Sequence, residues 1–319
     1  MRRIAAALIA PLIAVAVLAG CGGSSSPAAS SSPNASVTAT SGFGTAPTVK
    51  IPAAKAGDNL YTKTETQGSG QPLGKTGAFL GNYVVYIWSG TKHSLALSTY
   101  TASPQVLSTS LLPGLKTALV GQKMGSRVLA VLPPKYGYGS EGNPEVGITG
   151  TDTLVYVVDI IKSYAATQSA HGTTESNGGG GLPTVTSASG TAPTVQIPAS
   201  SPPGSLQVKT LIKGSGPAVT KGQEVVTQYV GVNWRTKTVF DSTWQRGTPF
   251  GFQLDASPPQ IIPGWDDGLL GVTVGSRVML VIPPADGYGS SGNSSAGING
   301  TDTLVFVIDI IDAANANSS

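Results

Sequence analysis

The sequence predicts an α+β protein with two domains of similar structure, each an antiparallel β-sheet wrapped around one short helix. Three observations support this prediction. Long stretches of the chain occur twice, about 150 residues apart. Within the repeated stretches, apolar residues alternate with other residues, which is the pattern of β-strands. Gly and Pro are abundant, with 42 and 23 of 319 residues, and this favours turns and short strands over long helices.

The repeats define the domains. "GTAPTVKIPA" (44–53) recurs at 190–199, "GSRVLAVLPPKYGYGSEGN" (125–143) recurs in similar form at 275–293, and "GTDTLVYVVDII" (150–161) recurs at 300–311. The starting positions differ by 146 in the first pair and by 150 in the others, so the first copy lacks four residues, lost between about His93 and Pro113. Two copies are too few for a solenoid. We therefore expect a duplicated domain, at 44–164 and 205–313.

Each copy has clear strand signals, which we describe for the second. Residues 276–282 alternate and then stop at Pro283-Pro284, and proline ends strands because it cannot donate a ladder hydrogen bond. Residues 303–311 alternate as well, which predicts a strand with one face on a core. The residues of that face are Leu304, Phe306, Ile308 and Ile310.

One helix is predicted, in "PGWDDGLLG" (263–271). Pro263 suits the first helical position, and Asp266 lies in the first turn, where a carboxylate interacts favourably with the helix dipole. Trp265 and Leu269 are four residues apart and so share one face. A sheet that wraps around this helix would bury that face.

The N-terminus predicts export. Residues 1–20 have a basic start, an apolar run and an exit of small residues, as in a secretory signal. Leu18-Ala19-Gly20-Cys21 resembles a bacterial lipobox, which implies lipid attached to Cys21 and a protein held on the outer face of a membrane. An ordinary signal peptide with a free Cys is the alternative, but Cys21 is the only Cys of the chain. Residues 21–43 and 165–204 read as a flexible tether and a Gly/Ser/Pro linker, and 314–319 as a tail.

Composition excludes several classes of function. The net charge is +3 and includes Arg2 and Arg3, so the exported chain carries too little positive charge to bind nucleic acid. "GYGSSG" (287–292) matches a dinucleotide-binding pattern but no helix is predicted after it. The only two histidines, His93 and His171, lie in a variable loop and in the linker, which disfavours metal or triad chemistry. No cofactor and no metal are expected.

The second copy resembles the FKBP-type peptidyl-prolyl cis-trans isomerases from about Leu206 to Asp312. The runs that match are "YVGVNWRTKTVFDSTWQRGTPFGFQL", "QIIPGWDDGLLGVTVGSRVMLVIPPADGYGSSGN" and "TLVFVIDII". The resemblance implies a hydrophobic cleft between sheet and helix that holds proline. Its catalytic residues would be Asp241, Tyr288, Trp265 and Phe240, and its substrate-binding residues Tyr229, Arg246, Phe250, Ile261, Ile262, Ile298 and Phe306. Asn293, where many members have His, would alter ligand preference at the rim.

Isomerisation of an X-Pro bond requires no nucleophile, metal or redox group. Rotation about an X-Pro bond is opposed by amide resonance, with a barrier of about 18–20 kcal/mol. No bond breaks, so an apolar site that disfavours the planar amide is sufficient. By the resemblance, the Ile262 N–H and the Tyr288 hydroxyl would anchor substrate carbonyls, with Arg246 as ion partner of Asp241. Singly, these aromatic residues are more often core than site. Taken together at the spacing of the family, with Asp241 inside an apolar wall, they favour a cleft.

The first copy departs from this pattern where the cleft would be. It keeps Tyr83, Tyr138 and Ile148 but has Leu115 in place of Trp265. Either Ser94-Leu95 or Ala96-Leu97 replaces Phe240-Asp241, and no Arg replaces Arg246. We therefore expect an active second domain and a degenerate first one. A first domain with a relaxed but active cleft remains an alternative, and a degenerate one could be a spacer, a peptide-holding module or a pairing surface.

These features predict an isomerase that assists the folding of exported proteins. Proline-containing polypeptides are the expected partners, and the resemblance adds macrolides of the rapamycin class. The alternative is a noncatalytic peptide-binding or chaperone module, in which both clefts only hold apolar peptide.

Overall fold

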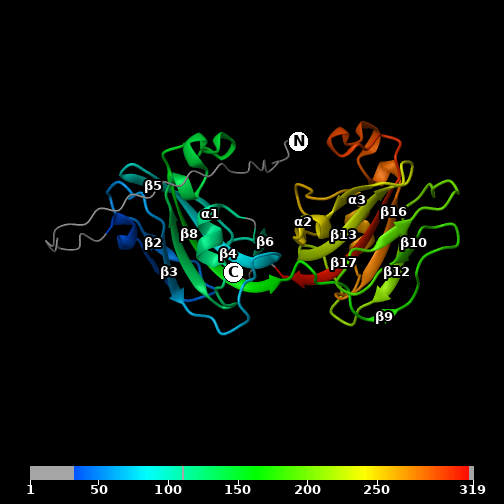
Figure 1. The fold of residues 1–319 in the computed structure, drawn as a ribbon, viewed down its shortest axis with the longest axis horizontal. Coiled ribbons are helices and arrows are strands. Elements are labelled where there is room, and N and C mark those ends of the chain that lie inside the picture. Colours follow the sequence, from blue (N-terminus) through cyan, green and yellow to red (C-terminus); the bar gives the residue numbers. More distant parts are fainter. Residues whose placement is uncertain (1–31, 110, 316–319) are drawn as a thin grey trace, which may run out of the picture. The chain divides into compact units, whose positions relative to one another are not determined.

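The structure is a computed structural model that describes residues 32–109 and 111–315. The predicted signal peptide and Cys21 lie outside these residues. The described chain forms two large antiparallel sheets, one from each repeat, and two small hairpins (Figure 1). None of the helices in the described ranges is long and apolar enough to cross a membrane.

The first domain contains a six-stranded sheet in the order β3-β7-β8-β4-β5, with β6 also paired to β4. Helix α1 follows β6, and three single turns of 3-10 helix lie between β7 and β8. The bounds are β1 Thr38–Thr40, β2 Thr48–Lys50, β3 Tyr61–Thr66, β4 Ala78–Ser89, β5 Lys92–Ser98, β6 Gln105–Ser108, α1 Pro113–Leu119, β7 Arg127–Leu132 and β8 Thr153–Tyr164.

The second domain repeats this plan in the strand order β14-β13-β17-β16-β12-β9, with β15 paired to β13. A short helix, α2, separates β14 from β15 and has no counterpart in the first domain. The bounds are β9 Thr173–Thr174, β10 Thr184–Thr186, β11 Thr194–Gln196, β12 Gln207–Lys213, β13 Glu224–Asn233, β14 Val239–Ser242, α2 Thr243–Arg246, β15 Phe250–Gln253, α3 Pro263–Leu269, β16 Arg277–Ile282 and β17 Leu304–Ala314.

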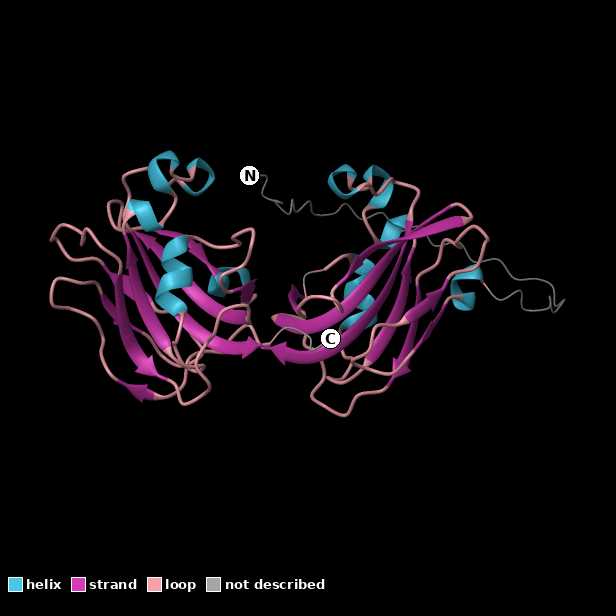
Figure 2. Cartoon of the chain, turned by 180° about the vertical axis from the view of Figure 1, so that it is seen from behind, coloured by secondary structure: helices cyan, strands magenta, loops and turns pink. Residues whose placement is uncertain are grey.

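The predicted helix is present as α3, and Pro263 occupies its first turn as expected. Helix α1 in the first domain and helix α3 in the second each pack against one face of their sheet (Figure 2). Trp265 and Leu269 of α3 are buried there with Leu280, Ile282 and Ile308 of the sheet. Gly264 and Gly268 allow this close approach, because an added Cβ at either position would lie 2.7–2.8 Å from a side chain of β16.

The other face of each sheet is also buried, which the alternating pattern did not predict. Val305 and Val307 of β17 are fully buried although they point away from the helix. The hairpin formed by β10 and β11 covers them with Val185 and Ile197. In the first domain the hairpin formed by β1 and β2 covers the equivalent face with Val37 and Ile51.

Part of the chain expected to be tether and linker is therefore folded. Residues 33–40 include a 3-10 turn and β1, and Asn34 is buried, with its amide bonded to the backbone of Gly57 and Asn59. The hairpin of β10 and β11 lies within 165–204. These segments are rich in Ser, Thr and Gly, so only a few apolar residues in each hold it on the sheet.

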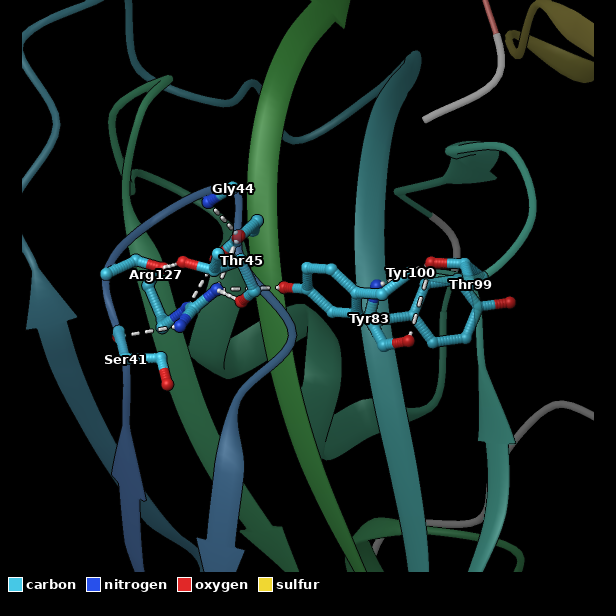
Figure 3. A network of polar contacts seen from close by, with 9 residues as sticks. Ser41, Gly44, Thr45, Tyr83, Thr99, Tyr100 and Arg127 are labelled. Carbon is cyan, nitrogen blue, oxygen red and sulfur yellow. Dashed lines mark hydrogen bonds and ion pairs between the residues drawn. The ribbon is translucent and has the colours of Figure 1, made fainter. Parts of the chain in front are cut away.

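A buried ion pair lies beneath each hairpin, Arg127 with Asp159 in the first domain and Arg277 with Asp309 in the second. Arg127 of β7 bonds to Asp159 of β8, and neither side chain is exposed to solvent. The Arg127 guanidinium donates to the carbonyls of Ser41 and Thr45 at 2.7 and 2.6 Å, and Asp159 accepts from the N–H of Gly44 at 2.7 Å (Figure 3). Burial of a charge pair is costly unless further hydrogen bonds satisfy it. The loop between β1 and β2 supplies them.

Candidate functional site

The site predicted in the second domain is built around the indole of Trp265 on α3. Four aromatic rings surround it, with centroids 5.1 Å away for Tyr229, 5.2 Å for Phe306, 5.5 Å for Phe252 and 6.4 Å for Phe250. All four contacts are edge-to-face, which is a preferred geometry for aromatic pairs. Trp265 is 3% exposed, so its ring forms the base of the cluster.

The remaining predicted apolar residues lie around this base. Phe240 of β14 is edge-on to Phe306 at 5.5 Å, and it is partly exposed. Ile261, Ile262 and Tyr288 also pack against the cluster while keeping part of their surface in solvent. Ile298 is buried. The nine apolar and aromatic residues of the predicted site therefore belong to or pack against one core cluster of the second domain, and the other two, Asp241 and Arg246, bond to Tyr229 of that cluster.

Asp241 and Arg246 supply the polar part of the site. The Tyr229 hydroxyl donates to Oδ2 of Asp241 at 2.5 Å, and the Arg246 guanidinium forms an ion pair with the same carboxylate. Arg246 also donates to the Tyr229 hydroxyl at 3.1 Å and lies over its ring, 5.6 Å from the centroid. The Asp241 and Arg246 side chains are 36% and 47% exposed, so their attraction is weak and orients more than it stabilises.

Local sequence positions this polar group. Strand β14 pairs with β13 so that Asp241 lies opposite Gly231, two residues beyond Tyr229. The Thr243 hydroxyl accepts from the Tyr229 N–H at 2.7 Å, and the Ser242 side chain caps α2. The single turn of α2 ends at Gly247, whose φ of +66° closes the helix. This turn places the Arg246 guanidinium next to the Asp241 carboxylate, with which it forms the ion pair.

Two contributors were not predicted as site residues. Phe252 stacks on Phe250 at 5.5 Å and contacts Trp265. Gly231 leaves room for Phe240, because a Cβ there would lie 2.7 Å from the Phe240 ring and 3.0 Å from Phe306. The alternation of "FGFQ" in β15 places Phe250 and Phe252 on one face, which is the signal that could have identified Phe252.

The electrostatics keep the Tyr229 phenol protonated. Burial raises its pKa above the ordinary value, and the neighbouring Arg246 guanidinium opposes that shift. At neutral pH the hydroxyl is thus a donor, which suits its bond to the Asp241 carboxylate. Within the described ranges, no three side chains of His, Cys, Asp or Glu come together in a group that could hold a metal ion.

The equivalent place in the first domain has different chemistry. The pairing of β5 with β4 puts Leu97 opposite Val85, so Leu97 occupies the position of Asp241 and Ala96 that of Phe240. The hydroxyl of Tyr83, the counterpart of Tyr229, donates to Gln105 at 2.6 Å. Strand pairing places Gln105 at the position of Phe250 and Leu107 at that of Phe252. Together with Leu115, these residues leave the first domain without the carboxylate or the aromatic base.

Known proteins resemble this chain in the same regions. The family model for "FKBP-type peptidyl-prolyl cis-trans isomerase" matches residues 82–161 and 216–311, together more than half of the chain. An FK506-binding protein of Streptomyces anulatus is 43% identical over 119 residues, covering 37% of this chain and 94% of that protein. A probable FK506-binding protein of Corynebacterium glutamicum is 40% identical over 121 residues, covering 38% of this chain and 98% of that one.

Among solved structures, FkpA from Escherichia coli matches with 35% identity and a TM-score of 0.32, covering 35% of this chain and 49% of that chain. The two matched stretches lie one in each copy of the repeat. On the family model and its bacterial relatives, the chain belongs to the FKBP-type peptidyl-prolyl cis-trans isomerase family and is an isomerase of X-Pro peptide bonds.

Proposed function

We propose that the second domain carries the isomerase activity of the chain and that the first domain does not. The observation that supports this most is the pair of Tyr229 and Asp241 beside an aromatic base. Only the second domain combines that carboxylate with Trp265, while the first has Leu97 and Leu115 at these places. The prolyl ring would lie on Trp265, with the walls supplied by Tyr229, Phe250 and Phe306.

The site would accelerate rotation without forming any covalent bond. A planar amide is more polar than the twisted one, so a dry aromatic site disfavours the ground state more than the transition state. The Ile262 N–H and the Tyr288 hydroxyl would hold the flanking carbonyls, which fixes the peptide while the prolyl bond turns. Asp241, held by Tyr229 and Arg246, would orient the rim of the site. Phe240 would close it from the side of β14.

The substrates we propose are X-Pro bonds in exported polypeptides. This rests on the signal-like N-terminus and on Cys21, which would carry a lipid and hold the chain on the outer face of the membrane. Isomerisation of X-Pro bonds takes tens to hundreds of seconds without a catalyst and limits the folding of many chains. Macrolides of the rapamycin class would occupy the same aromatic site, since two relatives are named for binding one such compound, FK506.

A matched pair of variants tests the assignment of activity. Tyr229→Phe removes the hydroxyl that holds Asp241, and Tyr83→Phe removes the hydroxyl at the same place in the first domain. We expect Tyr229→Phe to lower kcat/KM for a proline-containing peptide at least threefold, whereas Tyr83→Phe leaves it unchanged. The assay is cis-trans isomerisation of the peptide by the full chain. An equal loss in both variants would show that the two domains share the activity.

A further inference from the structure

The first domain contains an apolar cavity of about 270 Å³ between its sheet and helix α1. Residues of β4, β5, β6, α1 and β8 line it, among them Leu107, Leu112 and Leu115. The cavity lies where the second domain has its aromatic cluster, because Leu107 stands for Phe252 and Leu115 for Trp265. The smaller side chains leave this space while the sheet behind it remains packed, with Val128 and Leu132 fully buried.

The residues that line the cavity favour the binding of an uncharged group. All twelve lining residues are aliphatic or aromatic, and none carries a charge at neutral pH. Burial raises the pKa of Tyr83 to about 12, and the nearby Glu224 carboxylate adds to that shift, so this phenol stays neutral. A charged side chain in the cavity would lose its hydration, and no lining residue carries a charge to compensate, which is unfavourable.

The mouth of the cavity is apolar as well. Leu97, which lines the cavity, is 45% exposed and occupies the position of Asp241. The Asp241 carboxylate of the second site is thus replaced by an exposed leucine. An apolar group that enters the cavity would cover part of this surface too.

The volume and shape of the cavity further limit which groups can bind in it. An apolar cavity of about 150 Å³ holds a molecule as large as benzene, and pockets for drug-sized ligands begin near about 300 Å³. A volume of about 270 Å³ therefore suits one large side chain and is too small for a macrolide. The base offers Leu115 instead of an indole, so a prolyl ring has no flat aromatic face to lie on. A flexible aliphatic side chain fills such an irregular space better.

We propose that this cavity binds one large aliphatic side chain, of Leu, Ile or Met, from an extended segment of an unfolded polypeptide, and holds that segment without isomerising it. The first domain would then retain a client chain near the catalytic domain by a contact that does not depend on proline. The inference goes beyond the proposed function, and its test reports on the first domain alone.

The test is methyl NMR of the full chain with labelled leucines, titrated with pentapeptides Ac-Gly-Gly-Xaa-Gly-Gly-NH2 in which Xaa is Leu, Pro or Asn. The methyls of Leu112, Leu115 and Leu119 line the cavity, and those of Leu269 and Leu304 report on the second domain. We expect saturable shifts of the cavity methyls with the Leu peptide, binding at least fivefold weaker with Pro, and no shift with Asn. Absence of saturation with the Leu peptide, or equal binding of Pro and Leu, would overturn the proposal.

Two variants locate the binding. Leu115→Trp restores the residue that the second domain has at this position and fills the cavity, so binding should weaken at least tenfold. Leu97→Ser changes an exposed residue at the mouth, so the fold is retained, and binding should weaken at least threefold. Isomerase activity should equal that of the unaltered chain in both variants. Binding that is unchanged in both would contradict the proposal.

Discussion

The Tyr229 phenol and the Asp241 carboxylate lie 2.5 Å apart in the second domain, joined by a hydrogen bond that the first domain lacks. In the first domain, the counterpart phenol of Tyr83 donates to Gln105, a residue from a different strand, β6. The equivalent tyrosine thus belongs to a charged site in the second domain and to an uncharged one in the first.

Replacing the carboxylate and the aromatic base with the residues of the first domain should remove most activity. Asp241→Leu copies Leu97, and Trp265→Leu copies Leu115. We expect each change to reduce kcat/KM about tenfold, which corresponds to about 1.4 kcal/mol of transition-state stabilisation. Cooperative unfolding should persist, because the first domain has leucine at both places and its sheet is still packed, with Val128 and Leu132 fully buried. Isomerisation of a proline-containing peptide and thermal unfolding are the measurements; full activity of the double variant would mean that both residues are structural.

Gly231→Val should act on the site through Phe240. A Cβ at this position would lie 2.7 Å from the Phe240 ring, so the ring must move. The first domain has Val85 here and Ala96 in place of Phe240, which avoids the collision. We expect kcat/KM to fall at least threefold. The compensating variant Gly231→Val with Phe240→Ala should show no further loss relative to Phe240→Ala alone. Additive losses would contradict a collision between these two residues.

Stability of the second domain should depend on Asp302 at acid pH. Hydrogen bonds from Arg235 hold the pKa of this buried carboxyl below its usual range, and the Asn299 N–H and the Asn233 amide also donate to it. Because the folded pKa is depressed, the unfolded chain binds the proton more readily. The stabilisation is therefore present above the unfolded pKa of about 3.9. It is lost as the pH falls toward the folded pKa, by at most about 1.4 kcal/mol per pH unit.

The experiment compares Asp302→Asn with Asp152→Asn, its counterpart in the first domain. Burial pushes the Asp152 pKa up, but hydrogen bonds from the Thr149 N–H and from the Ser89 and Thr149 side chains together lower it below its usual value, without an arginine. In calorimetry between pH 2.5 and 6 (a range chosen to span the unfolded value), the stability lost through Asp302→Asn should shrink as the pH falls below about 4. A smaller change is expected for Asp152→Asn. A loss independent of pH in both variants would rule out the titration of these groups as the cause.

Breaking the ion pair beneath the hairpin should destabilise the first domain strongly. Arg127→Met leaves the Asp159 charge buried without a partner, which typically costs about 3–5 kcal/mol. The double variant Arg127→Met with Asp159→Leu should recover part of this, since no charge remains buried. Calorimetry on the full chain would measure both. Equal stability of the single and double variants would mean that the uncompensated charge is not the source of the cost.

Cys21→Ser should release the protein from membranes. The prediction rests on the lipobox-like Leu18-Ala19-Gly20-Cys21 and on the absence of any other Cys in the chain. In cell fractionation, the unaltered protein should sediment with membranes and the variant should move to the soluble fraction. Mass spectrometry of the N-terminus checks for the lipid directly. A protein that is fully soluble and carries no lipid before the change would refute the anchoring proposal.

Several features of this protein were determined by local sequence. The helix at Pro263–Leu269 and the strands at Arg277–Ile282 and Leu304–Ala314 follow from proline positions and apolar spacing, which act over a few residues. Two differences of the first repeat were likewise visible in the sequence: Leu115 stands in place of Trp265, and no Arg replaces Arg246. These features could be predicted because each depends only on residues that are close together in the sequence.

Other features depended on contacts between distant residues, and only the tertiary structure decided them. The sequence left two alignments open for the first domain, and the pairing of Val85 with Leu97 selected one, because a strand's register is set by the strand beside it. Strand β1 and the β10–β11 hairpin lay in segments that read as tether and linker, since Val37, Val185 and Ile197 are too few to indicate a core by themselves. They are buried because a sheet built from other parts of the chain presents an apolar face to them.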